Sequence, residues 1–156
     1  MDRQSLVQAV MREEIVMREE IVVPAARRGE PVTSRVRFAA GDVCVVEVRV
    51  GGDLEARGEG RDLFEALASA RRSLEADGVV LACNGARRDV FPSAMQRQAA
   101  GGRYAYVLEM PRTASRPPVV DIFALAPESS VLATVDEQRE WFDRWRQTGP
   151  GEGGSP

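Results

Sequence analysis

Hydrophobic and charged residues alternate along the middle of the chain with the two-residue period of a β-strand. In residues 43–50 (VCVVEVRV) every second side chain from Cys44 onward is apolar, and Glu47 and Arg49 lie between the apolar positions. Residues 35–38 (RVRF) alternate in the same way. Because successive side chains of a strand point to opposite faces, this pattern predicts strands with one buried side and one side in water.

A turn at residues 51–53 (GGD) connects the second of these strands to residues 54–57 (LEAR). A three-residue loop there implies three cross-strand pairs: Val50–Leu54, Arg49–Glu55 and Glu47–Arg57. Two of the pairs join opposite charges, and the third continues the apolar face. We therefore predict a β-hairpin with this register.

Residues 62–77 carry the pattern of an amphipathic helix. Asp62 followed by Glu65 matches a capping box, and Gly78 is a typical helix stop. Apolar residues recur at helical spacing, at Leu63, Leu67, Ala70 and Leu74. The charged residues lie mostly off this stripe, and we expect them to face water: Arg61, Glu65, Arg71, Arg72 and Glu75.

A second helix is predicted to begin after Thr134. Thr134 and Glu137 match another capping box, and the arginines near residue 145 favour the carboxyl end of the helix dipole. Both tryptophans of the chain lie in this segment, so we expect the helix to dock firmly on the core. Its apolar stripe consists of Val135, Trp141, Phe142 and Trp145.

Three further segments predict strands. Residues 79–83 (VVLAC) are apolar throughout, which is typical of a strand buried on both sides. Residues 103–110 (RYAYVLEM) alternate cleanly and place both tyrosines on one face. Residues 119–125 (VVDIFAL) follow a Pro-Pro break. Strands and helices do not alternate as in doubly wound proteins, so we predict an α+β fold. It consists of a mostly antiparallel sheet of about five strands, two main helices packed on one face, and an N-terminal helix.

The two ends of the chain differ from the centre in composition. Residues 1–23 contain the hexapeptide MREEIV twice in tandem, and we assign them to a charged N-terminal helix, either exposed or packed on a partner. Residues 24–34 have the composition of a linker, and residues 35–147 form the predicted single α+β domain. Residues 148–156 have the composition of a disordered tail.

The composition excludes many classes of enzyme. The chain has 156 residues, a net charge of −3 and no histidine, and all 21 of its basic residues are arginine. Without histidine, Ser-His-Asp and Cys-His catalysis are impossible within this chain. Without lysine there is no P-loop lysine and no Schiff base. The negative charge argues against a general binder of nucleic acids or anionic membranes. We expect no cofactor and no metal.

The N-terminal sequence MDRQSLVQAVMREEIV is acidic and interrupted by charges, unlike a secretory signal. No apolar run is long enough to span a bilayer, so we expect a cytoplasmic location. Two cysteines are too few for a disulfide scaffold. Cys83 ends an apolar run, which favours a buried, inert thiol over a nucleophile. The candidate acid-base carboxylates come from different elements, and sequence does not place them together: Asp89, Glu109 and Asp121.

The segment from Asn84 to Tyr104 is the strongest candidate for a site. Asn84 and Gly85 form a turn pattern, and Ser93 is placed to cap a short helix at residues 94–99. Two interpretations stay open. The segment either connects two strands, or it offers amide and guanidinium groups to a small anion such as a phosphate or carboxylate. The candidate ligand-binding residues are Asn84, Arg87, Arg88, Ser93, Arg97 and Tyr104.

Several motifs in order along the chain resemble a family of small uncharacterised bacterial proteins. They are CNGARRDVFPSAMQRQ, GGRYAYVL, VVDIF and ATVDEQREWFDRW, and the resemblance covers about residues 58–147. The family has no established activity, so the resemblance implies no catalytic residues. It implies that the segment from 84 to 104 is a family feature.

Three functions follow from these observations, and we expect the first. The first is a non-catalytic, cytoplasmic protein-interaction or regulatory module, since the sequence offers no catalytic set. The second is a protein that binds a small anion or nucleotide-like ligand through residues 84–104. The third is an enzyme that uses Cys83 or carboxylates. The expected partner is another protein, or else a phosphorylated or carboxylate small molecule.

Overall fold

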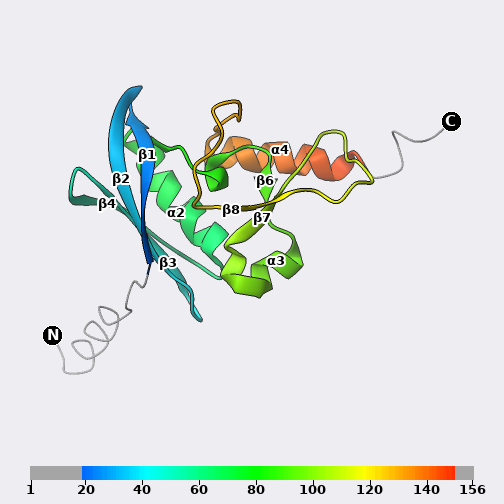
Figure 1. The fold of residues 1–156 in the computed structure, drawn as a ribbon, viewed down its shortest axis with the longest axis horizontal. Helices are drawn as coiled ribbons and strands as arrows, with labels where there is room; N and C mark the ends of the chain where they lie inside the picture. Colours follow the sequence, from blue (N-terminus) through cyan, green and yellow to red (C-terminus); the bar gives the residue numbers. More distant parts are fainter. Residues whose placement is uncertain (1–18, 150–156) are drawn as a thin grey trace.

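The computed structural model describes residues 19–149. A five-stranded antiparallel sheet with the strand order β4-β3-β2-β1-β5 curls around helix α2 (Figure 1). A second antiparallel sheet, with the order β6-β7-β8, lies beside helices α3 and α4. The fold is therefore α+β, as the element order predicts, with two sheets instead of one.

The strands of the first sheet are β1 (Glu19–Arg27), β2 (Glu30–Ala39), β3 (Cys44–Val50), β4 (Asp53–Gly60) and β5 (Val79–Leu81). The second sheet contains β6 (Val90–Phe91), β7 (Tyr104–Val107) and β8 (Val119–Asp121). The helices are α2 (Leu63–Ala76), α3 (Ala94–Gln98) and α4 (Val135–Gln147), and the 3-10 turns are η1 (Asn84–Ala86) and η2 (Ala99–Gly102).

The first described residues form a hairpin, which corrects two predictions. The predicted helix over 1–23 lies mostly outside the described residues, and its last part, 19–23, is strand β1. The predicted linker 24–34 is the hairpin between β1 and β2. Arg28 and Gly29 make its two-residue turn, with φ angles of 50° and 84°, as a type I′ turn requires. Pro24 obscured the strand pattern, but it lies at the end of the β1–β5 pairing, where its missing N–H costs little.

The hairpin between β3 and β4 confirms one predicted pair and corrects two. Glu47 lies opposite Arg57, as expected. The turn contains two residues and not three, and a bulge next to Val48 shifts the register. Near the turn, the observed pairs are Arg49–Leu54 and Val50–Asp53.

Helix α2 confirms the predicted helix over 62–77 to within one residue at each end. Asp62 caps it by accepting the Glu65 N–H at 2.8 Å. The capping box is incomplete, because the Glu65 carboxylate accepts the Arg61 N–H and not that of Asp62. The helix backbone approaches β4 closely: a Cβ atom on Gly58 would lie 2.1 Å from the Ala66 carbonyl oxygen. Only a glycine leaves room for this contact.

Strand β5 is at the edge of the first sheet, and it pairs with β1. Its Val79 and Leu81 are buried, but Val80 between them is 43% exposed. The prediction of a strand buried on both sides is therefore wrong. Val80 lies on the outer sheet face, which no helix of the described chain covers (Figure 1).

The second sheet differs from the expected pattern. Residues 103–110 form only the short strand β7, and the buried residue of β7 is Ala105. Tyr104 is 43% exposed, whereas Tyr106 is partly buried against the core, so the tyrosine face is divided between water and the core. Residues 119–125 form β8 over three residues, and Ile122 and Phe123 after it are fully buried.

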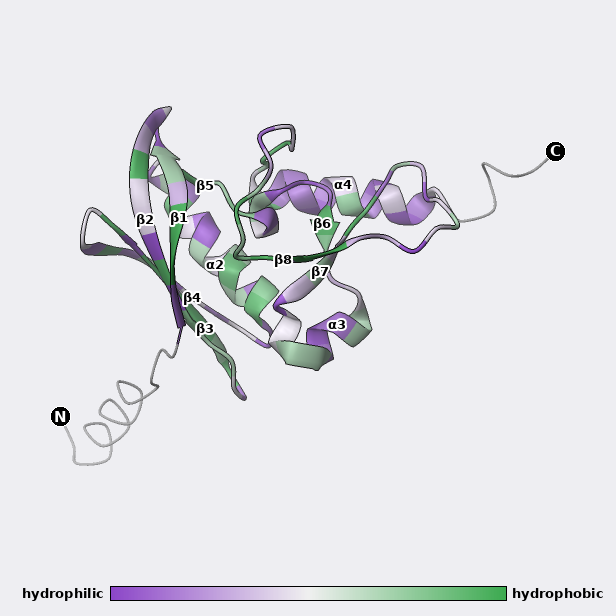
Figure 2. Cartoon of the chain, in the orientation of Figure 1, coloured by the Kyte–Doolittle hydropathy of each residue, from purple (hydrophilic) through white to green (hydrophobic). Residues whose placement is uncertain are grey.

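Helix α4 begins where predicted, with a complete capping box between Thr134 and Glu137. It is hydrophilic along most of its length (Figure 2). The Phe142 ring stacks on Phe91 of β6 with ring centroids 3.7 Å apart, and the Trp145 Nε1 donates to the Glu109 carbonyl at 2.9 Å. The apolar stripe of α4 thus packs on the second sheet, and the two main helices do not share one face of a single sheet.

Candidate functional site

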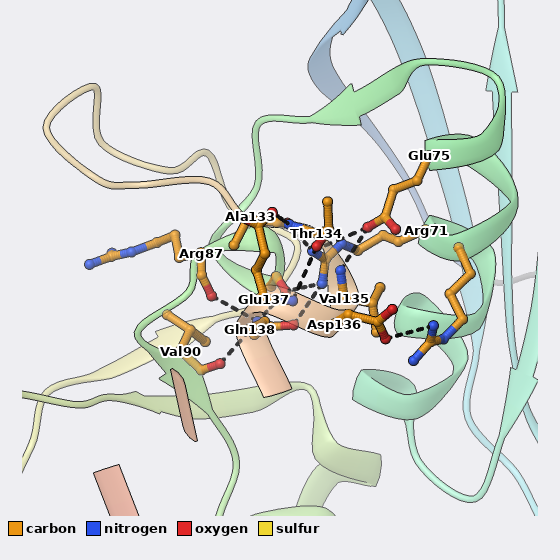
Figure 3. A network of polar contacts seen from close by, with 12 residues as sticks. Arg71, Glu75, Arg87, Val90, Ala133, Thr134, Val135, Asp136, Glu137 and Gln138 are labelled. Atoms are coloured by element: carbon orange, nitrogen blue, oxygen red, sulfur yellow. Dashed lines mark hydrogen bonds and ion pairs between the residues drawn. The ribbon is translucent and has the colours of Figure 1, made fainter. Parts of the chain in front are cut away.

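A buried polar network joins α2 to the start of α4 and fixes the segment after β5 (Figure 3). The Arg71 side chain is 4% exposed. Its Nη1 donates to Gln138 Oε1 at 2.7 Å and to the Gly85 carbonyl at 3.0 Å, and its Nη2 donates to the Ala133 carbonyl at 2.6 Å. Glu75 lies 3.9 Å from the guanidinium. The prediction that Arg71 faces water is therefore wrong.

Gln138 completes this network from α4. It is 2% exposed, and its Nε2 donates to the backbone carbonyls of Gly85, Arg87 and Val90 at 3.0, 2.7 and 3.1 Å. Burial lowers the pKa of the Arg71 guanidinium. The side chain is still charged at neutral pH, because arginine is not deprotonated in proteins. The network satisfies buried carbonyls that would otherwise cost free energy, so its role is to hold residues 85–90 in place.

The predicted ligand residues at the start of the segment satisfy one another. Arg87 forms a bidentate pair with Asp89, from Nε to Oδ1 at 3.0 Å and from Nη2 to Oδ2 at 3.1 Å. Its Nη1 also donates to Asn84 Oδ1 at 3.3 Å. Asn84 donates its own amide to the Asp121 carbonyl. The charge that a bound anion would need is thus already neutralised by a carboxylate.

The other predicted ligand residues are divided among α3, β7 and the segment before β6. Ser93 caps α3 in a complete capping box with Gln96, which confirms the predicted short helix. Arg97 of α3 pairs with Asp62 at 2.8 Å. Arg88 is exposed, and Tyr104 lies on β7. Among the side-chain hydrogen bonds of residues 19–149, only the one from Arg87 to Asn84 joins two of the six predicted residues.

The possible catalytic groups are also held in structural contacts. Cys83 is 1% exposed, and burial raises the pKa of its thiol, although the charge of Arg71 opposes the shift. A protonated, buried thiol is a poor nucleophile. Asp89 pairs with Arg87, and Asp121 pairs with Arg103 at 3.1 Å. Two of the three candidate carboxylates are therefore engaged in ion pairs.

A groove of about 1080 Å³ lies where α2, α3 and the start of α4 meet. We call it the helical groove. Phe64 of α2 and Phe91 of β6 are among its apolar lining residues, and their rings meet edge to face. Its lining consists of Glu59, Arg61, Asp62, Phe64, Glu65, Ala68, Ser69, Arg72, Phe91, Ala94, Arg97, Gln98, Val135, Gln138 and Arg139.

Arginines from all three helices contribute to the helical groove. Arg97 lies over both aromatic rings, with its guanidinium carbon 5.5 Å from the Phe64 centroid and 5.4 Å from the Phe91 centroid. Arg139 approaches Phe91 from α4, at 6.0 Å. Arg72 of α2 reaches Asp136 of α4 at 3.0 Å across the helix junction. The groove therefore combines apolar surface with charged walls.

Sequence reasoning did not find this groove. It placed Arg61 and Arg72 on a solvated face, which is correct for each residue alone, and it assigned Arg97 to a different site. A partial indication was present, because Phe64 lies beside the apolar stripe of α2 and not within it. The approach of α3 and α4 to that side of α2 depends on tertiary packing.

No protein-family model matches the chain, and the search of curated proteins finds no match. The resemblance described above therefore stays an expectation. None of the helices within residues 19–149 is long and apolar enough to cross a membrane.

Proposed function

We propose that this protein is a non-catalytic interaction module that binds another protein through the helical groove. The observation that carries the proposal is the groove itself, with Phe64 and Phe91 in its lining and charged side chains on its walls. Small-molecule sites are usually enclosed and predominantly apolar, with few polar groups. Of the fifteen residues that line this groove, seven are charged. This mixture of apolar core and charged rim is typical of protein interfaces.

Two further observations support a binding role over catalysis. The buried thiol of Cys83 and the paired carboxylates of Asp89 and Asp121 are engaged in the fold. The small-anion alternative receives less support, because Arg87 and Arg97 are each paired with a carboxylate. A regulatory role in the cytoplasm is the setting that we propose for the interaction.

The proposal is tested by blocking the groove with one bulky side chain. Ala94 is exposed and lines the groove, so Ala94→Trp fills it without disturbing the core. Met95, the next residue, is 79% exposed and lies outside the groove lining, and Met95→Trp is the matched control. Each full-length variant is immobilised, and proteins from a lysate of the source organism are captured and quantified by mass spectrometry.

We expect a specific protein to be retained by the wild-type chain and by Met95→Trp, and to be lost from Ala94→Trp. Equal retention by all three chains would show that the groove is not the binding surface. A thermal-shift screen with phosphorylated metabolites checks the alternative in parallel, because a ligand that binds the native state raises the melting temperature. A clear shift in that screen would favour the small-anion function.

A further inference from the structure

The charges around the helical groove are unequal, although the chain as a whole is acidic. Four arginines line the groove: Arg61, Arg72, Arg97 and Arg139. Three carboxylates line it as well, but one of them is withdrawn: the Asp62 side chain is 6% exposed, caps α2 and pairs with Arg97. Glu59 and Glu65 are the exposed carboxylates. Because Asp62 neutralises Arg97, three arginines and two carboxylates remain accessible, an excess of one positive charge on a chain whose net charge is −3.

Two of these arginines are held by weak contacts only. The Arg72 and Asp136 side chains are 57% and 74% exposed, and those of Arg139 and Asp143 are 62% and 50% exposed. Ion pairs between exposed side chains contribute little to stability, so little is lost when a guanidinium exchanges its partner. Both arginines are therefore available to carboxylates of a bound chain. Arginine also binds carboxylates in bidentate geometry, which favours acidic side chains over other acceptors.

The apolar part of the groove accommodates a hydrophobic side chain. Ala68 of α2 and Ala94 of α3 line the groove with small side chains, and Phe91 is 7% exposed beside them. Arg97 and Arg139 lie near the Phe91 ring, so an aromatic ring that enters here meets both ring and guanidinium surfaces.

From this charge distribution we infer that the groove takes an acidic segment of a partner protein, with an aromatic residue flanked by glutamates or aspartates. The inference rests on the proposed function and names the chemistry of the partner. The carboxylates would bind the arginines on both walls, and the aromatic residue would occupy the space beside Phe91. Since exposed charges carry part of the binding, the affinity falls as salt concentration rises.

The test uses labelled synthetic peptides and the full-length protein. The probe has one central tryptophan between two runs of glutamate. Three comparison peptides replace the glutamates by glutamine, the glutamates by lysine, or the tryptophan by alanine. Affinity is measured by fluorescence anisotropy, and the bound position is mapped by NMR shifts of backbone amides. We expect the glutamate peptide to bind about tenfold more tightly than the glutamine peptide, with the largest shifts around Ala68 and Ala94.

Variants of the protein separate the groove from general charge effects. The double variant Arg72→Glu/Arg139→Glu should bind the glutamate peptide about tenfold more weakly than the wild-type protein does. The charge-matched control Arg88→Glu/Arg116→Glu changes two exposed arginines outside the groove lining and should change the affinity less than about twofold. Circular dichroism confirms that both variants are folded.

The inference is overturned by equal or tighter binding of the glutamine or lysine peptide, by no binding of the glutamate peptide at millimolar concentration, or by amide shifts outside the groove. It is also overturned by equal losses in the two double variants. The Ala94→Trp capture experiment tests the proposed function independently of the peptide measurements. If Ala94→Trp abolishes capture of a protein but the double variant Arg72→Glu/Arg139→Glu does not, the proposed function holds and the acidic partner is excluded.

Discussion

Arg71 and Arg72 are neighbours on the same helix, yet their roles differ completely. The Arg71 side chain is 4% exposed and donates to three oxygens of the interior, whereas the Arg72 side chain is 57% exposed and reaches a single exposed carboxylate. The two residues are chemically identical, and successive positions on a helix are separated by about 100° of rotation. The rotation of α2 about its axis therefore decides which arginine stabilises the fold and which is available for binding.

The same division runs through the whole molecule. One region, around Arg71 and Gln138, uses polar groups to satisfy buried carbonyls. The other, in the helical groove, holds Arg72 and Arg139 at the surface in weak pairs. Buried hydrogen bonds are costly to break because the remaining partner stays unsatisfied, whereas exposed ion pairs exchange readily with water. Stability and binding capacity are thus located on adjacent faces of one helix.

The largest expected effect comes from removing the buried arginine. Arg71→Met leaves the Ala133 carbonyl and Gln138 Oε1 without a donor, and it leaves the Gly85 carbonyl with the Gln138 amide as its side-chain donor. We expect the free energy of unfolding to fall by about 3 to 4 kcal/mol. Arg72→Met, one residue further, should change it by less than about 0.5 kcal/mol. Urea unfolding followed by circular dichroism measures both, and equal losses would contradict the distinction between the two arginines.

The next prediction concerns what sets the rotation of α2. A Cβ atom on Gly58 would lie 2.1 Å from the Ala66 carbonyl oxygen, so Gly58→Ala forces helix and strand apart. We expect a loss of about 2 to 3 kcal/mol in the free energy of unfolding. Gly41 is the control, because a Cβ atom there would make only an ordinary contact of 3.6 Å. A tolerated Gly58→Ala would show that the glycine does not fix the helix position.

The glutamine of the buried network should contribute less than the arginine. Gln138→Leu keeps the size of the side chain roughly constant and leaves three backbone carbonyls with fewer donors. We expect a loss of about 2 kcal/mol in thermal or urea unfolding. Gln147 at the exposed end of α4 is the matched position, and Gln147→Leu should have little effect. A neutral Gln138→Leu would mean that water replaces the lost hydrogen bonds.

Helix capping gives a smaller effect at the start of α4. The Thr134 hydroxyl accepts the Glu137 N–H at 3.1 Å, and Thr134→Ala removes this bond. We expect a loss of about 1 kcal/mol in the free energy of unfolding. Thr113, on the exposed loop between β7 and β8, provides a control substitution to alanine without a helix cap.

The same cap predicts the smallest effect, which depends on pH. The Thr134 N–H donates to the Glu137 carboxylate and lowers the pKa of that group below its ordinary value. A lowered pKa in the folded state means that the stabilisation is complete above the ordinary glutamate value of about 4.3 and is lost as pH falls through the folded value. The free energies of unfolding of wild type and Glu137→Gln are compared between neutral and acidic pH to isolate this contribution. A constant difference between the two free energies across that range would refute the prediction.

Local features of the fold were predictable because they depend on neighbouring residues. The caps at Asp62, Ser93 and Thr134 each involve groups within three residues of one another, and all three begin helices as predicted. The pairing of Glu47 with Arg57 also agrees with the prediction, because the bulge next to Val48 restores the register that the shorter turn shifts. Strand β1 was missed because Pro24 and the charged turn disrupt its local pattern, although distant pairing with β2 and β5 stabilises it.

The candidate site was far less predictable. The arginines of residues 84–104 looked like one cluster along the chain, but their partners, Asp89 and Asp62, lie in different places in the fold. The helical groove combines residues from α2, β6, α3 and α4, and no sequence spacing relates them.

The amino-acid sequence by itself determined the α+β class, the positions and caps of the helices, and the absence of histidine- and lysine-based catalysis. These properties follow from composition and from interactions between residues close along the chain. Only the tertiary structure decided which arginines are buried, which carboxylates neutralise them, and where three helices leave a groove. Those outcomes depend on contacts between distant residues, such as Arg71 with Gln138, and on the rotation of α2 against Gly58.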